Sequence, residues 1–145
     1  MKKIALLSAA LCLAFAAAAP AKDDHLQLSI EDAMNTSDAK DKLDGSVKFF
    51  FGKQKHGTPK QKFGTFTANK KTNFVGKSNN EACQRAFLSS MISLQERAQK
   101  EGGDAVINIK SVYKKDELES ETEYVCGAGT FMGGVALRGE VVKLQ

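Results

Sequence analysis

Few residues of this chain combine into a pattern typical of a reactive site. Its two histidines, His25 and His56, lie about thirty residues apart in polar segments, whereas a structural zinc site takes four ligands at close spacing. His56 and Cys83 would be the base and nucleophile of a thiol enzyme, but no third residue is evident to orient them. We therefore predict no metal site, no cofactor and no enzymatic activity. A thiol- or metal-linked enzyme is the alternative.

The sequence Gly76-Lys77-Ser78 resembles the end of a phosphate-binding loop that leads into a helix. That motif requires an earlier glycine at position 71, where this chain has Lys71. No apolar run ending in aspartate supplies a magnesium ligand. We interpret Ser78 as a helix cap and predict that the protein binds no ATP.

Three glycines near the C-terminus do not have the spacing of a dinucleotide-binding loop. Gly127, Gly129 and Gly133 are followed by residues typical of a strand, not of a helix. Glycines in strands mark bulges or places where backbones approach closely. We therefore predict close strand packing or a bulge at these positions.

A stretch of positive charge between Asp44 and Glu81 is the best indication of a binding function. It contains no acidic residue, and phenylalanines are interleaved with its lysines, a combination that binds nucleic acid or lipid headgroups. Alternatively, the phenylalanines face inward and the lysines form a solvated edge. An acidic segment at 116–123 would also allow copies to associate head to tail as a homo-oligomer. The candidate anion-binding residues are Lys48, Lys53, Lys55, Lys60, Lys62, Lys70, Lys71 and Lys77.

A helix and a strand between residues 78 and 110 must position much of this chain. Ser78 and Glu81 form a capping box, and Gly102 is placed to end the helix in the left-handed conformation. Leu88 and Ile92 form a second apolar flank, which packs in a wider core or against a partner. The main apolar face recurs every three or four residues, at Cys83, Phe87, Met91, Leu94 and Ala98.

The strand that follows the helix alternates in the way that a half-buried antiparallel strand does. Ile107 and Ile109 are predicted to share one face, and Val106 the other. We predict further strands at 46–52, 62–68, 122–130 and 135–141, a polar turn at 69–73, and a turn or bulge at 131–134. A short charged helix is predicted at 31–43, weakened at 35–37. The fold class is α+β, with one main amphipathic helix packed on a mostly antiparallel sheet of about five strands, plus the short N-terminal helix.

The first 21 residues have the pattern of a secretory signal peptide. Lys2 and Lys3 precede an apolar run at 4–18, and Ala19-Pro20-Ala21 is a cleavage site. The run is about 15 residues, shorter than the roughly 20 that span a bilayer; a membrane anchor is the alternative. We predict cleavage after Ala21 and a bacterial periplasmic or secreted location. The remaining chain divides into an N-terminal extension at 22–45 and a single α+β domain at 46–145.

Cleavage has two consequences for charge and redox state. Removal of two lysines lowers the net charge from +4 to +2. Removal of Cys12 leaves Cys83 and Cys126, which in an oxidising compartment most simply form one disulfide. Two free buried thiols are the alternative. The bridge would attach the first turn of the main helix to the sheet.

The segment from Glu81 to Leu144 resembles two related families. It is similar to the YbjQ-like proteins, also called heavy-metal-binding domains, through the junction Gly102-Gly103-Asp104-Ala105-Val106-Ile107. It is also similar to the RcsF outer-membrane stress sensor, in which disulfides tie the helix start to the hairpin; Tyr124-Val125-Cys126 lies where that family has a cysteine. The whole chain after the predicted cleavage, including the segment 49–56, resembles a set of small secreted bacterial proteins that are often labelled excinuclease ATPase subunits.

This resemblance implies a fold and a role but no chemistry. The RcsF sensor has a lipid anchor and four cysteines, whereas this chain has no lipidation motif and two cysteines after cleavage. No cluster of histidine and cysteine supports metal binding. We predict a non-enzymatic exported domain that binds an unknown envelope protein or acts in envelope stress. The alternative is an anion-binding protein that contacts lipopolysaccharide, anionic lipid or nucleic acid through the basic stretch.

Overall fold

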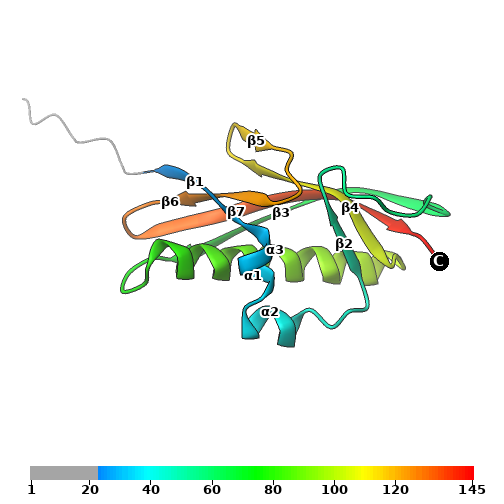
Figure 1. The fold of residues 1–145 in the computed structure, drawn as a ribbon, viewed down its shortest axis with the longest axis horizontal. Coiled ribbons are helices and arrows are strands. Elements are labelled where there is room, and N and C mark those ends of the chain that lie inside the picture. The colour runs from blue at the N-terminus through cyan, green and yellow to red at the C-terminus, as the bar shows by residue number, and fades with distance from the viewer. Residues whose placement is uncertain (1–22) are drawn as a thin grey trace, which may run out of the picture.

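The computed structural model describes residues 23–145, so the predicted signal peptide at 1–21 lies outside the described residues. Seven strands form one curled sheet, and the long helix α3 lies along one of its faces (Figure 1). In chain order the elements are β1 (Asp24–Ser29), α1 (Ile30–Met34), α2 (Ser37–Lys42), β2 (Lys48–Phe51), β3 (Gln61–Asn73), α3 (Asn79–Glu101), β4 (Ala105–Tyr113), β5 (Asp116–Leu118), β6 (Glu123–Ala128) and β7 (Met132–Lys143).

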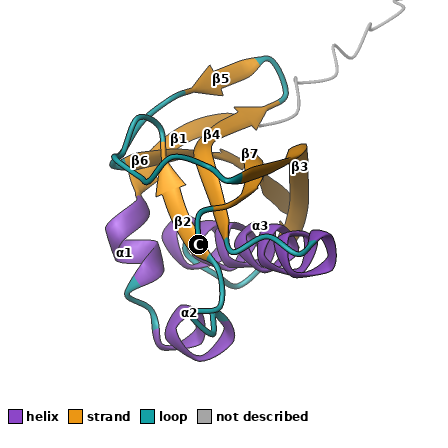
Figure 2. Ribbon diagram, turned by 90° about the vertical axis from the view of Figure 1, so that its right-hand side faces the viewer, coloured by secondary structure: helices purple, strands orange, loops and turns teal. Residues whose placement is uncertain are grey.

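The sheet has the order β1-β6-β7-β4-β2, with β3 paired to β7 and β5 paired to β4. Every pair is antiparallel except β2 with β4. The short helices α1 and α2 lie to one side of α3, and β5 lies above the sheet on the opposite side (Figure 2). The predicted α+β class and mostly antiparallel sheet are confirmed. The expected five strands were too few, because the N-terminal segment pairs as β1 and the charged loop after β4 folds back as β5.

Helix α3 begins and ends where its capping residues predict. The Ser78 hydroxyl accepts a hydrogen bond from the Glu81 amide at 3.1 Å, and Gly102 ends the helix with a left-handed φ of 84°. All five residues of the predicted apolar face are at most 1% exposed. The Glu81 side chain does not complete the capping box, since its carboxylate instead binds Arg85 four residues on, at 3.2 Å.

Gln95 of α3 is polar and lies outside the predicted apolar face, yet it is buried. It is 5% exposed, and its amide nitrogen donates to the Lys42 carbonyl at 3.2 Å. Its amide oxygen accepts from the Asp44 amide at 3.3 Å. Because the segment between α2 and β2 runs across α3, Gln95 satisfies backbone groups that no helix or strand would pair.

Strand β3 is longer than the sequence suggests. Residues 69–73 were predicted to form a polar turn, but Asn69 to Asn73 pair with the start of β7, which was itself predicted as a turn or bulge. Gly133 and Gly134 leave room for this approach: a Cβ on Gly134 would lie 2.6 Å from the Lys70 carbonyl oxygen. The polar residues of β3 are compatible with an edge strand whose backbone is paired on one side only.

A bulge in β4 changes which residues share a face. Asn108 has a φ of 51°, and the pairing with β7 shifts between Ile107 and Lys110. Ile109 therefore packs in the core beneath α3, whereas Ile107 packs with Ala105 and the end of β7. The predicted common face for Ile107 and Ile109 is wrong, because one extra residue in a strand reverses the facing of the residues beyond it.

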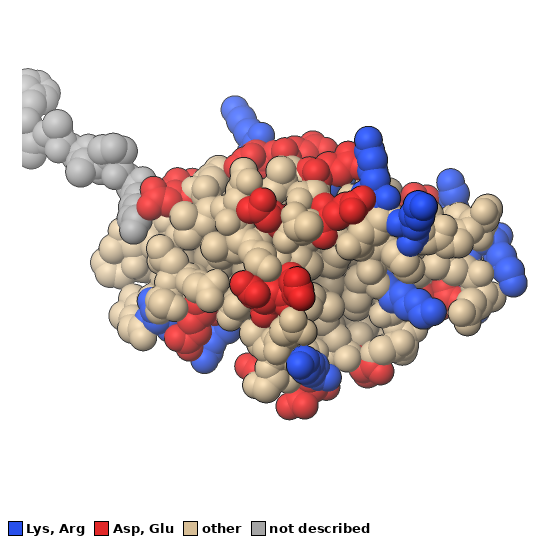
Figure 3. All heavy atoms as spheres, in the orientation of Figure 1, with Lys and Arg blue, Asp and Glu red and all other residues tan. Residues whose placement is uncertain are grey.

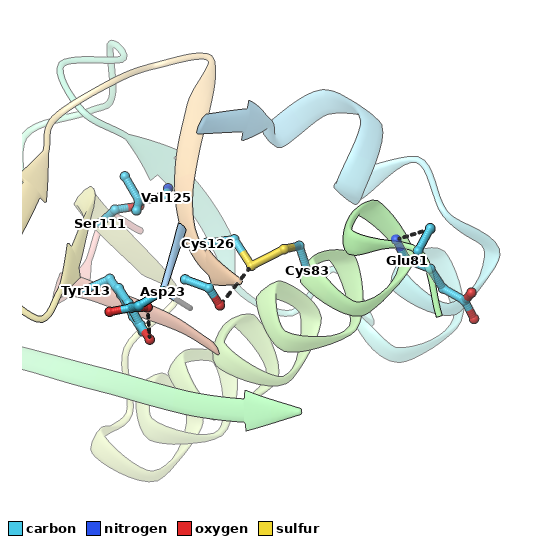
Figure 4. The surroundings of a disulfide bond; sticks show 9 residues. Asp23, Glu81, Cys83, Ser111, Tyr113, Val125 and Cys126 are labelled. Carbon is cyan, nitrogen blue, oxygen red and sulfur yellow. Dashed lines mark hydrogen bonds between the residues drawn. A yellow bond between two sulfur atoms is a disulfide. The ribbon is translucent and has the colours of Figure 1, made fainter. Parts of the chain in front are cut away.

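Ser111 holds the end of β4 against β6. Its hydroxyl is buried and accepts a hydrogen bond from the Val125 amide at 2.9 Å (Figure 4). We expect Ser111→Ala to lower the free energy of unfolding by about 1–3 kcal/mol, because the Val125 amide would be left buried without its partner. Urea denaturation measures this change. Ser89→Ala, on the exposed side of α3, is the matched control, and equal effects of the two substitutions would contradict the assignment.

Candidate functional site

The predicted disulfide is confirmed between Cys83 in the first turns of α3 and Cys126 in β6 (Figure 4). The two residues are 43 positions apart in sequence, their Cα atoms are 5.8 Å apart, and both side chains are fully buried. The bridge therefore joins the start of the helix to the sheet. The alternative of two free thiols is wrong for this pair, and the sulfur of Cys83 is not available as the nucleophile considered with His56.

His56 lies in the loop between β2 and β3, where its ring contacts nearby residues of the same segment. Its Nδ1 atom is hydrogen-bonded to the Gly57 carbonyl at 2.7 Å, and its ring contacts the Phe50 ring at a centroid distance of 5.6 Å. Ser78, the last residue of the loop that resembled a phosphate-binding motif, caps α3. Lys71, which stands in place of the first glycine of that motif, belongs to β3. The segment before α3 is thus a short connection between a strand and a helix.

The eight candidate anion-binding lysines fall into two groups at opposite ends of β3. Seven of them are exposed, and Lys77 is half-buried. Lys62 and Lys70 are separated by eight residues of β3, a span of about 25 Å. We call Lys48, Lys53, Lys55, Lys60 and Lys62 the loop-end lysines, and Lys70, Lys71 and Lys77 the tip lysines. The structure therefore does not bring the basic stretch together as one patch.

The acidic segment lies on β5 and its flanking turns, above the sheet, where acidic side chains gather at the top of the face shown in Figure 3. Glu117 pairs with Lys110 of β4 at 2.6 Å, and this hydrogen bond holds the pKa of Glu117 below its ordinary value. Lys53, one of the loop-end lysines, lines a surface hollow together with Glu119 and Glu121. Lys53 and the acidic segment are thus neighbours on the same molecule.

A polar cluster that the sequence did not reveal joins β1 to the β4–β5 hairpin. His25 places Nδ1 at 3.0 Å from an Asp116 oxygen and Nε2 at 3.5 Å from an Asp23 oxygen. The ring also meets the Tyr113 ring edge-on at 5.1 Å. The residues of β1 lie about ninety positions from those of the hairpin in sequence, and the packing of β6, the partner of β1, beside β4 brings them together.

Contacts within this cluster, together with burial, shift the pKa values of Asp23 and Tyr113. Lys114 donates a hydrogen bond to Asp23, and this bond lowers the pKa of the Asp23 carboxyl. Burial raises the pKa of Tyr113, whose hydroxyl donates to the other Asp23 oxygen at 3.5 Å. The two ring nitrogens of His25 face different carboxylates, so the donors do not converge on a common point. Within residues 23–145, no group of three or more His, Cys, Asp or Glu side chains is arranged to hold a metal ion.

A surface hollow of about 370 Å³ lies between β2 and the C-terminal residues. Lys48, Phe50 and Asp104 are among its lining residues. The Asp104 carboxylate accepts hydrogen bonds from the amides of Leu144 at 2.7 Å and Gln145 at 3.0 Å. These bonds hold the pKa of Asp104 below its ordinary value of 3.8. The charge of Asp104 therefore serves to fasten the end of the chain beside β4.

Asp104 should make stability depend on pH in the acid range. Because its pKa is lower in the folded protein than in the unfolded chain, its contribution is fully present above the unfolded pKa. That contribution is lost as the pH falls through the folded value. We expect Asp104→Asn to be less stable than the native protein at pH 6, with the difference shrinking below about pH 4. Urea denaturation between pH 2 and 6 measures it; a constant difference over that range would contradict the prediction.

Comparison with known proteins identifies no relative of this chain: no family model, no curated protein and no solved structure matches it. Within residues 23–145, no helix is long and apolar enough to cross a membrane. The residues and geometry of this chain are therefore the basis for inferring its function. The likeness to the YbjQ-like and RcsF-like families stays a prediction.

Proposed function

We propose that this chain is a non-enzymatic binding domain that is exported to the periplasm and acts there through its surface, as a binding or envelope-stress accessory module. The observation that carries the proposal is the buried Cys83–Cys126 disulfide. Disulfides of this kind persist in oxidising compartments and are rare in the cytosol. The signal-peptide pattern of the first 21 residues, which is independent of the disulfide, supports the same compartment.

The junction between α3 and β4 supports the YbjQ-like and RcsF-like part of the proposal. Each residue of Gly102-Gly103-Asp104 has a structural task here. Gly102 ends the helix, and a Cβ on Gly103 would lie 2.7 Å from the Val141 side chain. Asp104 accepts hydrogen bonds from the last two amides of the chain. The motif that carries the resemblance thus has a structural role. Binding would therefore occur through other residues, at the surface.

Export and oxidation are tested together by expressing the full chain in a Gram-negative bacterium and fractionating the cells. We expect a periplasmic protein whose mass corresponds to residues 22–145 with both cysteines oxidised. A variant with Ala19→Arg and Ala21→Arg should stay unprocessed, because the cleavage site needs small residues. A cytoplasmic protein with two reactive thiols would refute the proposal. Cross-linking in the periplasm followed by mass spectrometry then identifies the bound partner.

The second candidate function is binding of an anionic polymer or surface through lysines, and it is favoured by their segregation into two groups of like charge. Heparin is a suitable soluble polyanion. Retention that fades with salt is the signature of binding through lysines. Substituting Gln for Lys53, Lys55 and Lys60, or for Lys70, Lys71 and Lys77, shows which group binds. No retention of the native protein at low salt would remove this candidate.

A further inference from the structure

Three exposed large apolar side chains belong to two backbone segments that are paired at one corner of the molecule. Val75, Phe131 and Met132 are 57%, 69% and 52% exposed. Val75 lies in the connection from β3 to α3, and the other two lie at the turn from β6 into β7. The Phe74 amide donates to the Phe131 carbonyl at 2.7 Å, and Met132 pairs with the last residue of β3. We call these three residues the apolar tip.

The apolar tip is held in place by its backbone. Within the turn, the Gly129 amide donates to the Met132 carbonyl at 3.1 Å. Beside it, the Val75 amide donates to the Asn73 side chain at 2.7 Å. Phe74 is 4% exposed and anchors the corner in the core. Single exposed apolar residues are ordinary, whereas exposed apolar residues that gather on one surface mark a site of contact with a protein, a membrane or a ligand.

Positive charge accompanies the apolar tip. Lys71 and Lys70 pair with Gly134 and Val135, two and three residues beyond Met132, and Lys77 follows Val75 in the connection to α3. Two carboxylates in the adjoining elements are already engaged. Glu81 of α3 is paired with Arg85 at 3.2 Å, and Asp23 before β1 is paired with Lys114. The tip lysines are therefore placed to attract an anion.

The chain also joins the fold at this end. Asp24, at the start of β1, pairs with Ala128, the residue that ends β6 just before the turn. Strand β1 therefore begins beside the apolar tip (Figure 1).

We propose that the apolar tip inserts into the surface of an anionic phospholipid bilayer while the tip lysines bind the headgroup phosphates. An apolar corner with lysines in the same segments matches the two properties of such a bilayer, an apolar interior and a negatively charged interface. Lys62, the one loop-end lysine on β3, lies about 25 Å from Lys70 along that strand, and the loop-end lysines do not take part. The proposal names the partner of the second function above and rests on it.

Tryptophan fluorescence locates the contact, because the chain contains no tryptophan of its own. The processed protein, beginning at Lys22, is prepared with Phe131→Trp in one sample and Thr58→Trp, in the β2–β3 loop, in the other. Vesicles contain phosphatidylcholine alone or with 30% phosphatidylglycerol. We expect a blue shift with the anionic vesicles for position 131 only. No shift at 131, or equal shifts at both positions, would overturn the proposal.

Substitutions separate the apolar and ionic contributions. Phe131→Ser with Met132→Ser should weaken vesicle binding about tenfold or more, measured by co-sedimentation. Substituting Gln for the tip lysines should weaken it roughly fivefold per lysine at low salt. The same change at Lys53, Lys55 and Lys60 should leave it unaltered. Circular dichroism checks that each variant is folded, and full binding by the serine variant would overturn insertion.

Failure of this proposal is distinct from failure of the functions on which it builds. Heparin retention through the tip lysines without vesicle binding would refute insertion and leave anion binding intact. Loss of both would refute the anion-binding function as well. Export is decided separately, by the mass and the location of the processed chain.

Discussion

Replacing Cys83 and Cys126 together by alanine should lower the free energy of unfolding by about 4 kcal/mol. The bridge closes a loop between residues 43 positions apart, and the chain-entropy model relates the stabilisation to that length. A domain of this size has a total stability of roughly 5–15 kcal/mol. The disulfide therefore supplies a large share of it, and the double variant should unfold at a urea concentration about 2 M lower.

Reduction gives the control for this prediction. A reducing agent should destabilise the native protein toward the value of the double variant and leave that variant unchanged. Because both sulfurs are fully buried, reduction of the folded protein should be slow and should accelerate with added urea. A difference below about 1 kcal/mol between the native protein and the variant would show that the bridge contributes little.

Gly133→Ala is expected to be the most damaging single substitution of a small residue in the sheet. A Cβ there would lie 2.2 Å from the Gly127 carbonyl oxygen and 2.7 Å from the Phe74 ring. The first of these contacts is with backbone of a paired strand, which cannot rotate away. We expect a loss of at least about 3 kcal/mol, from overpacking and from disruption of the β6–β7 pairing. Urea denaturation measures it.

Gly57→Ala is the matched control. A Cβ at Gly57 would meet nothing within 4 Å, so its effect should stay below about 1 kcal/mol. Equal effects of the two substitutions would contradict the close approach of β6 and β7. Since Gly133 adjoins Met132, the damaging substitution should also displace the apolar tip, and loss of vesicle binding in that variant would follow from misplacement of the tip.

Both expectations agree with a protein that acts through a rigid surface. The disulfide fixes α3 to β6, and Gly133 allows β6 and β7 to meet just behind the turn that bears Phe131. Phe74 fills the space beneath the same corner. The disulfide, the close approach of β6 and β7 at Gly133, and Phe74 therefore support the end of the molecule that is proposed to contact a membrane.

The sequence by itself determined the features that depend on neighbouring residues. The ends of α3 follow from Ser78 and Gly102, and its buried face follows from the spacing of its apolar residues. The break between α1 and α2 follows from the polar residues at 35–37, with Thr36 capping the second helix. The disulfide also followed, because only two cysteines remain after the predicted cleavage. Each of these features depends on local geometry or on the number of cysteines. None of them requires knowledge of how distant segments pair.

Only the tertiary structure decided the features that depend on pairing between distant segments. The polar residues at 69–73 form a strand because they pair with the backbone of β7. The bulge at Asn108 is seen only in the register between β4 and the same strand, β7. Residues far apart in sequence form the cluster around His25, whereas the continuous basic stretch is divided by the length of β3. Hydrogen bonds across a sheet form between strands irrespective of their distance along the chain. The whole fold therefore sets the register of each strand and determines which side chains share a surface.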